Sequence, residues 1–396
     1  MSELLKVFNG RIITPDRSIN NGTVIVKGGK IAEVSDKNIE VTGATEIDAQ
    51  GQYVTPGFID IHVHGGGGFD FMDGTVEAFL EIARLHARYG TTAMLPTTLS
   101  ASPEELDATL KAYEESVNKN TMGATFLGMH LEGPYFAMSQ RGAQDPRFIR
   151  DPDPNEYQRI LVRAPFIKRW SAAPELKGAM EFGSYMTMHG VLAAVAHTDA
   201  IYEEVAEAVK HGFSLATHLY SGMSGVTRRN AFRYAGVIES ALLIDEMDVE
   251  IIADGTHLPV PLLQLVHKIK GPGRIALITD AMRAAGMPPG PSMLGSLRNG
   301  LPVIVEDDVA KLPDRSSFAG SVATADRLIR SMVFGAGVSM MDTIQMITST
   351  PARILGHSAT KGSLDVGKDA DLVIFDHNVR IDKTVIGGKI VFDKNL

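Results

Sequence analysis

Short apolar runs and amphipathic stretches alternate through the middle of the chain. The amphipathic stretches predict helices, for example at 75–89, 103–118, 201–211 and 259–270. Pro103 and Pro259 suit the first turn of a helix. The apolar runs predict strands at 54–62, 91–98, 125–132, 171–174, 193–197, 214–218, 249–253 and 275–280. Such an alternation favours an α/β fold, a TIM-type (β/α)8 barrel with a parallel sheet.

A doubly wound sheet is the competing fold. It would be favoured by a Gly-x-Gly-x-x-Gly turn that opens a helix after the first strand. This chain has no such turn there, and its glycine run, Gly65 to Gly68, follows two histidines instead. The barrel is therefore the preferred interpretation.

Both ends of the chain are rich in β-forming residues. Residues 24–34 are two β-rich runs around a glycine turn, which predicts a hairpin. Residues 371–376 and 384–392 have the same character. We therefore expect a small β-sandwich domain built from residues 1–54 and 359–396, and a catalytic barrel domain at 55–358.

Composition narrows the class of protein. The chain has 396 residues, 44% of them hydrophobic and 21% charged, which suits one large and one small globular domain. The net charge of −9 disfavours nucleic acid as a partner. Without Cys there is no disulfide and no Cys-ligated metal site. With no apolar run near the roughly 20 residues of a membrane helix and no signal-peptide pattern, we expect a soluble cytoplasmic protein without a membrane partner.

Two histidines end the first predicted strand of the barrel. His62 and His64 lie in the run Pro56–Gly65, and alternate residues on a strand point to the same face. Two such imidazoles at a strand end provide half of a metal site. A chance His-x-His pair on a strand is the alternative.

Polar residues end most of the other predicted strands. They are Glu132, His197, His218, Asp254 with His257, and Asp280. In a parallel barrel the carboxyl ends of the strands form the active-site face. Glu132, His197 and His218 fit a site of two His and one carboxylate with an open position for water, whose pKa a bound metal lowers toward about 7. A salt bridge from Glu132 to an arginine is the alternative.

Asp280 ends the last predicted strand. A carboxylate beside a metal-bound water is suited to take its proton and later to donate it to a leaving group. A helix N-cap is the alternative role for this residue.

At this point the sequence resembles the amidohydrolase superfamily and, more closely, the N-acetylglucosamine-6-phosphate deacetylase family. The resemblance covers essentially the whole chain. Its motifs are PGFIDIHVHG (56–65), HLEGPY (130–135), AHTDA (196–200), ATHLYSGM (216–223), ADGTH (253–257), TDAM (279–282) and FAGS (318–321).

The resemblance implies a metal-dependent deacetylase that hydrolyses the N-acetyl group of an amino-sugar 6-phosphate to acetate and the amino-sugar phosphate. It implies one or two divalent ions (zinc, iron or manganese), bound by Glu132, His197 and His218, with His62 and His64 completing a second site. Asp280 would transfer the proton. The implied substrate-binding residues are Ala143, Gln144, Ser221, Gly222, His257, Phe318, Ala319 and Gly320, and Arg229, often from the neighbouring subunit of a homodimer, would bind the phosphate.

Two substrate contacts depart from the family pattern. Gln144 stands where the family usually has a histidine, and Ser221-Gly222 stands where it has Asn-Ala. The departures suggest the hypothesis that the substrate is an epimer, the galacto or manno compound. A different amidohydrolase activity, such as that of a cyclic-amide hydrolase or an N-acyl-amino-acid deacylase, is a competing interpretation, and a non-catalytic scaffold is a third.

Overall fold

The computed structural model describes residues 4–14 and 17–395. The parallel strands of the middle region form two sheets, with the orders β10-β9-β6 and β11-β12-β13-β14-β17-β18. Their bounds are β6 (Phe58–Val63), β9 (Thr91–Pro96), β10 (Thr125–Phe126), β11 (Met129–Glu132), β12 (Ile167–Ala172), β13 (Leu192–Val195), β14 (Phe213–Ala216), β17 (Asp248–Ile252) and β18 (Ile275–Ile278).

Backbone contacts connect the two parallel sheets at both edges. A parallel bridge links Thr97 to His130, and the Asp280 N–H donates to the His62 carbonyl at 2.9 Å. Apolar side chains from six of these strands meet in one buried cluster, which includes Ile59, Leu95, Ala194, Leu215, Ile252 and Ile278. The strands therefore form a curled parallel sheet within a mixed α/β fold.

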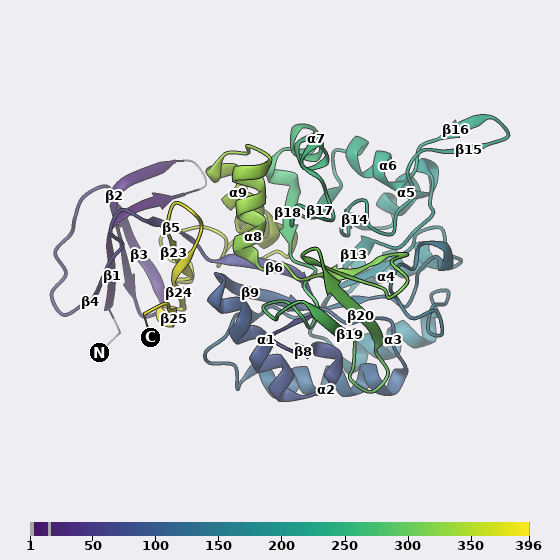
Figure 1. Cartoon of the computed structure of the whole chain (residues 1–396), viewed down its shortest axis with the longest axis horizontal. Helices are drawn as coiled ribbons and strands as arrows, with labels where there is room; N and C mark the ends of the chain where they lie inside the picture. The colour runs from purple at the N-terminus through teal and green to yellow at the C-terminus, as the bar shows by residue number, and fades with distance from the viewer. Residues whose placement is uncertain (1–3, 15–16, 396) are drawn as a thin grey trace.

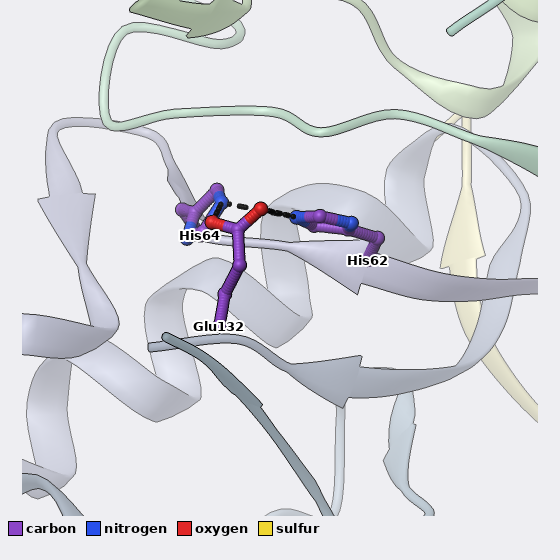
Figure 2. Close-up of side chains that lie close together, drawn as sticks. All are labelled: His62, His64 and Glu132. Atoms are coloured by element: carbon purple, nitrogen blue, oxygen red, sulfur yellow. Dashed lines mark hydrogen bonds and ion pairs between the residues drawn. The ribbon is translucent and has the colours of Figure 1, made fainter. Parts of the chain in front are cut away.

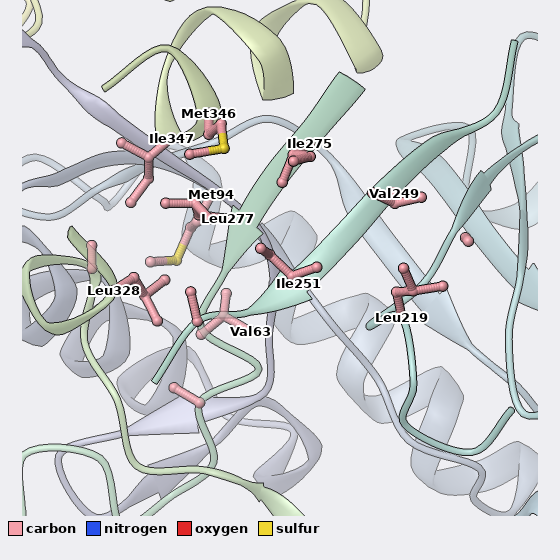
Figure 3. Close-up of a cluster of buried hydrophobic side chains, with 14 of the residues drawn as sticks. Val63, Met94, Leu219, Val249, Ile251, Ile275, Leu277, Leu328, Met346 and Ile347 are labelled. Atoms are coloured by element: carbon pink, nitrogen blue, oxygen red, sulfur yellow. The ribbon is translucent and has the colours of Figure 1, made fainter. Parts of the chain in front are cut away.

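Helices cover the outside of this curled sheet (Figure 1). They are α1 (Val76–Arg88), α2 (Pro103–Val117), α3 (Pro154–Arg163), α4 (Ala179–Met188), α5 (Tyr202–Lys210), α6 (Val237–Leu243), α7 (Val260–Lys270), α8 (Ala325–Arg330), α9 (Met340–Ile347) and α10 (Ser349–Ile354). Figure 3 shows the packing: Ile251 and Leu277 of the sheet share a buried cluster with Leu328 of α8.

The four helices predicted from the sequence are confirmed, and hydrogen bonds at two of their first turns explain where they begin. The Thr75 side chain accepts from the Ala78 N–H at the start of α1. Ser102 and Glu105 form a capping box at the start of α2, which has a proline in its first turn. Such caps satisfy N–H groups that have no partner within the helix.

A separate sheet combines strands from the two ends of the chain (Figure 1). Its order is β25-β24-β23-β5-β1-β2-β3, with β4 paired to β1. It has a buried apolar cluster of its own. The bounds are β1 (Leu4–Ile13), β2 (Ser18–Lys27), β3 (Lys30–Ser35), β4 (Thr45–Asp48), β5 (Tyr53–Pro56), β23 (Leu372–Phe375), β24 (Ile381–Ile386) and β25 (Lys389–Asp393).

Gly57 is the one residue between β5 of this sheet and β6 of the parallel sheet. A side chain here would overlap Thr92, so the close approach requires glycine. The predicted strand at 54–62 is therefore two strands that belong to different sheets.

Small antiparallel units complete the fold. Strands β15 (Thr227–Arg229) and β16 (Phe232–Tyr234) form a hairpin that projects from the body (Figure 1). A four-stranded sheet contains β19 (Gly290–Leu294), β20 (Leu301–Glu306), β21 (Val309–Lys311) and β22 (Phe318–Ser321). Strands β7 (Gly65–Gly66) and β8 (Phe69–Asp70) pair with each other.

Two further predicted strands differ from the structure. The strand predicted at 125–132 is two strands, β10 and β11, which belong to different sheets. The other differs in its bounds. The sequence prediction placed it at 171–174, whereas β12 runs from Ile167 to Ala172. Lys168 and Arg169 hide its beginning, because two adjacent charged residues break the apolar run, although Arg169 is fully buried. Among the residues that the structure describes, no helix has the length and apolar character needed to cross a membrane.

Candidate active site

The polar residues at the ends of the parallel strands converge. His62 lies in β6, with His64 directly after it, and Glu132 is the last residue of β11. His197, His218 and Asp280 each lie two residues beyond the end of their strand, β13, β14 and β18 respectively. All six are buried, with exposed fractions of 0 to 8%.

Three of these residues have left-handed backbone conformations. The φ angles are 46° for His197, 31° for His218 and 47° for Asp280. Residues other than glycine rarely adopt positive φ, and such conformations concentrate at functional sites where the surrounding structure enforces them. Here the turn directly after each strand directs the side chain toward the centre of the strand-end face.

Glu132 lies between two groups of imidazoles. Its Oε1 is 2.9 Å from His218 Nε2 and 3.5 Å from His197 Nε2. On the other side, Oε1 is 3.4 Å from His62 Nε2 and Oε2 is 3.4 Å from His64 Nε2 (Figure 2). Each group, taken with Glu132, offers ligand atoms that all lie within 4.8 Å of one another.

The donor set fits divalent cations. His62 Nε2 and His64 Nε2 are 3.2 Å apart and point toward each other and toward Glu132. Imidazole and carboxylate together suit zinc, iron and manganese. In the part of the chain that the structure describes, Glu132 forms no ion pair with Lys or Arg, so the alternative of an arginine salt bridge is wrong.

The buried carboxylates of the cluster are compensated by histidines, whose charge depends on pH. Burial opposes the charged form of Glu132, but His62 and hydrogen bonds from His197, His218 and His64 lower its pKa well below the usual value. Burial likewise opposes charge on His64, whereas Asp280 and Glu132 raise its pKa to about 10. A divalent cation bound here would place positive charge beside these two buried carboxylates.

Asp280 lies against the two histidines of β6. Its Oδ1 is 3.1 Å from His64 Nε2 and 3.4 Å from His62 Nε2. Although burial raises the pKa of this carboxyl, His62 and His64 lower it below the ordinary value. No helix begins directly after Asp280 in the described chain, so the N-cap alternative is wrong.

Backbone and carboxylate groups orient two of the rings. His197 Nδ1 donates to the Gln140 carbonyl at 2.8 Å, which leaves Nε2 toward Glu132. His257 Nδ1 donates to Asp254 Oδ2 at 2.8 Å. Gly222 lies against the ring of His197, since a Cβ there would be 2.7 Å from its Nδ1. Such supporting contacts fix the tautomer of a ligand histidine.

The sequence prediction missed two charged residues beneath the cluster. Arg169 and Glu250 are fully buried and form an ion pair, and Glu250 Oε2 is 3.5 Å from His62 Nδ1. His130 lies beside His62 and bonds Ser171 Oγ at 2.7 Å. Their signal was present: each interrupts an apolar strand with a charged or titratable group.

A cavity of about 290 Å³ opens above the cluster. It brings together most of the predicted site: His64, Glu132, His197, His218, Asp280, Ala143, Gln144, Ser221, Gly222, His257, Phe318 and Gly320. Three predicted residues do not line the cavity. His62 and Ala319 are fully buried and outside the lining, and Arg229 is exposed on the β15–β16 hairpin, its guanidinium 5.5 Å from the Tyr234 ring.

Known proteins with similar sequences share one chemistry. A family model described as the Amidohydrolase family matches residues 53–391. An N-acetylglucosamine-6-phosphate deacetylase from Bacillus subtilis is 34% identical, covering 99% of this chain and 98% of that protein. An N-acetylgalactosamine-6-phosphate deacetylase from Escherichia coli O157:H7 is 32% identical, covering 96% of this chain and 97% of that protein.

Solved structures agree with this assignment over the whole chain. A mutant N-acetyl-D-glucosamine-6-phosphate deacetylase from Mycobacterium smegmatis, in complex with N-acetyl-D-glucosamine-6-phosphate, has a TM-score of 0.89 and 29% identity, covering 98% of this chain and 99% of that one. A deacetylase of the same name from Pasteurella multocida has a TM-score of 0.90 and 27% identity over the same shares. The chain belongs to the amidohydrolase family.

Proposed function

We propose that this protein is a metal-dependent deacetylase that hydrolyses N-acetylglucosamine-6-phosphate to acetate and the amino-sugar phosphate. The observation that carries the proposal is the convergence of Glu132, His197 and His218, with Asp280 beside them, on one cavity. The names of full-length relatives supply the substrate.

The finer architecture belongs to the same proposal. Residues 55–358 form a closed (β/α)8 barrel, and residues 1–54 and 359–396 form a β-sandwich domain. The hydrogen bond from the Asp280 N–H to the His62 carbonyl supports closure. The pairing of β5 with both β1 and β23 supports a domain made from the two ends.

Glu132, His197 and His218 would hold one divalent ion, and His62 and His64 a second, with Glu132 shared between them. A bound divalent ion polarises a carbonyl and lowers the pKa of a bound water toward about 7. Zinc, iron and manganese all suit these ligands. The shared position of Glu132 is supported by its two oxygens, of which Oε1 faces His218 and Oε2 faces His64.

The residues of the chain divide the remaining tasks. Asp280 takes a proton from the attacking water and gives it to the departing amine, a role supported by its place in the cavity lining, with Oδ1 3.1 Å from His64 Nε2. Asp254 holds His257 Nδ1, so Nε2 is the ring nitrogen available to a sugar hydroxyl in the cavity. Ala143, Ser221, Gly222, Phe318, Ala319 and Gly320 form or support the walls around the sugar.

The phosphate needs a cation from outside this cavity. Among the described residues that line it, none is Lys or Arg. Arg229 lies on the exposed hairpin, outside the cavity of its own chain. We therefore assign it to the phosphate of a neighbouring subunit in a homodimer. A cytoplasmic location stays a prediction from the sequence.

The galacto and manno epimers are not favoured as substrates. The similar protein from Bacillus subtilis and the solved structures from Mycobacterium smegmatis and Pasteurella multocida are named for the gluco compound. The structure also weakens the reason for suspecting an epimer, because the amide nitrogen of Gln144 bonds Glu132. Its difference from the family histidine therefore need not reflect a different sugar.

The test is an acetate-release assay with the three N-acetylated hexosamine 6-phosphates, alongside metal quantification. We expect turnover of the gluco compound, its loss on chelation, and recovery with zinc, iron or manganese. Absence of both bound metal and metal-dependent turnover would instead indicate a scaffold.

The Arg229→Ala variant tests the phosphate contact. It should lose activity on phosphorylated substrates and change little on unphosphorylated N-acetyl sugars. Arg228→Ala is the matched control, since adjacent residues on a strand face opposite sides. Equal losses on both substrate types would rule out a phosphate role and favour another amidohydrolase activity.

A further inference from the structure

Gln144 joins a metal-ligand carboxylate to the backbone of a neighbouring strand end. The residue is 4% exposed. Its Oε1 accepts from the Ser100 N–H at 2.8 Å, and its Nε2 donates to Glu132 Oε2 at 2.7 Å. Because a backbone N–H can only donate, the atom facing Ser100 must be the amide oxygen, which fixes the nitrogen toward Glu132.

We propose that Gln144 is a positioning residue of the metal site, which holds the Glu132 carboxylate in the orientation that binds the ion. The inference deepens the proposed function in that it takes Glu132 as the ligand. It differs from the role that family resemblance gives this position, where the side chain contacts the substrate.

Both ends of this link are anchored. Ser100 follows β9 closely, and there the Thr98 N–H donates to the His130 carbonyl at 3.0 Å. Thr98 Oγ1 in turn accepts from the Glu132 N–H at 3.3 Å. The Gln144 N–H donates to the Arg141 carbonyl at 2.9 Å, which closes a turn. The Gln144 amide therefore holds the Glu132 carboxylate in a fixed position relative to the segment that follows β9.

The hydrogen bond from Gln144 distinguishes the two carboxylate oxygens of Glu132. Gln144 bonds Oε2, which also lies 3.4 Å from His64. The other oxygen, Oε1, is thereby directed to His218 and His197, at 2.9 and 3.5 Å, and it also lies 3.4 Å from His62 Nε2. Without the amide, the end of the side chain could rotate about its last bond, a torsion with broad preferences.

The neutrality of glutamine matters for this role. A lysine, an arginine or a protonated histidine in the same place would supply positive charge and compete with a cation for the carboxylate. An amide donates a hydrogen bond without charge. It therefore orients Glu132 while leaving the negative charge available for the metal ion.

Zinc affinity of the metal-free protein, measured by competition with a chelating dye and without sugar, tests the role. Gln144→Met keeps the length of the side chain and removes both hydrogen bonds. We expect zinc to bind about 10–100-fold more weakly, the usual cost of losing a group that orients a metal ligand. Turnover should recover at excess zinc, with KM unchanged.

Ser221→Ala is the matched control, because Ser221 lines the same cavity and its backbone N–H donates to the His218 carbonyl, a bond that alanine keeps. It should keep the zinc affinity of the wild type. Gln144→Asn retains an amide, but its side chain is one methylene too short to reach both Ser100 and Glu132, so it should also weaken zinc binding. Circular dichroism would show whether the Met variant folds. If it does not, the zinc affinity of the Asn variant tests the proposal.

Unchanged zinc affinity with a raised KM at every zinc concentration would overturn the proposal in favour of direct substrate contact. Because zinc binding is measured without sugar, a wrong substrate assignment would leave this result intact.

Discussion

Two buried carboxylates inside the same curled sheet have opposite surroundings. Glu250, on β17, is paired with the guanidinium of Arg169, whose Nη2 donates at 2.8 Å. Glu132, at the end of β11, faces imidazoles and one neutral amide. Burial opposes the charge of both carboxylates, and both have lowered pKa values. Arg169, with His62, lowers the pKa of Glu250, whereas histidines lower the pKa of Glu132.

The comparison distinguishes Glu250, a carboxylate with a structural role, from Glu132, a carboxylate with a proposed functional role. A guanidinium stays protonated at any pH of interest, so Glu250 needs nothing from outside the chain. Imidazoles lose their charge more readily, and their nitrogens then offer lone pairs to a metal. A buried carboxylate compensated only by titratable groups therefore marks the place where an external cation is expected.

The largest effect on stability is expected from breaking the ion pair between Arg169 and Glu250. Arg169→Met leaves Glu250 buried without its guanidinium partner, and should lower the free energy of unfolding by about 3–5 kcal/mol. Urea unfolding of the metal-free protein measures this. The double variant Arg169→Met/Glu250→Leu should recover much of the loss, because it removes both charges. A double variant as unstable as the single one would show that packing, rather than charge, holds this layer.

The next effect concerns the cluster that needs an ion. Asp280→Asn preserves the shape of the side chain but cannot accept and return a proton, so turnover should fall by at least about 100-fold. Metal content should be retained, since Glu132, His197 and His218 remain. Metal analysis beside steady-state kinetics checks both halves, and full activity would eliminate the assignment of Asp280.

The smallest effect concerns a third carboxylate, Glu175, which pairs with neither an arginine nor a histidine among the residues that the structure describes. It accepts from Thr198 Oγ1 and the Asp199 N–H, and burial raises its pKa above the ordinary value. Its contribution to stability is therefore fully present below its unfolded pKa and is lost as pH rises through its folded pKa. Glu175→Gln removes this dependence.

The stability advantage of that variant over the wild type should grow from acid toward neutral pH and then level off. Thermal unfolding at a series of pH values measures it. An advantage that shrinks as pH rises would mean that the two hydrogen bonds outweigh burial and that the carboxylate is preferred.

The site was largely predictable because its residues stand where parallel strands end. Glu132, His218 and Asp280 follow from that rule alone, and the structure places them around one cavity. Their roles stay predictions. The rule depends on strand order only weakly, since every parallel strand delivers its carboxyl end to the same face.

The features that could not be predicted depend on contacts between distant segments. Arg169 and Glu250 are 81 positions apart, and only the neighbouring strands around β12 and β17 bring them together. The bond from Gln144 to Glu132 depends on the turn closed by Arg141, for which the sequence has no periodic signal. The boundary at Gly57 was lost because two adjoining strands read as one apolar run.

The pairing of β5 with β23 has a consequence for the gene. Every proposed ligand is encoded before residue 281, yet β5, which reaches β6 through Gly57 alone, pairs along its length with a strand encoded more than three hundred codons later. A premature stop codon after Gly367 would leave all of the proposed ligands and Asp280 in the product. It would nevertheless remove β23, the strand that pairs with β5, and β5 leads directly into the strand of His62. Such a message is expected to yield inactive protein.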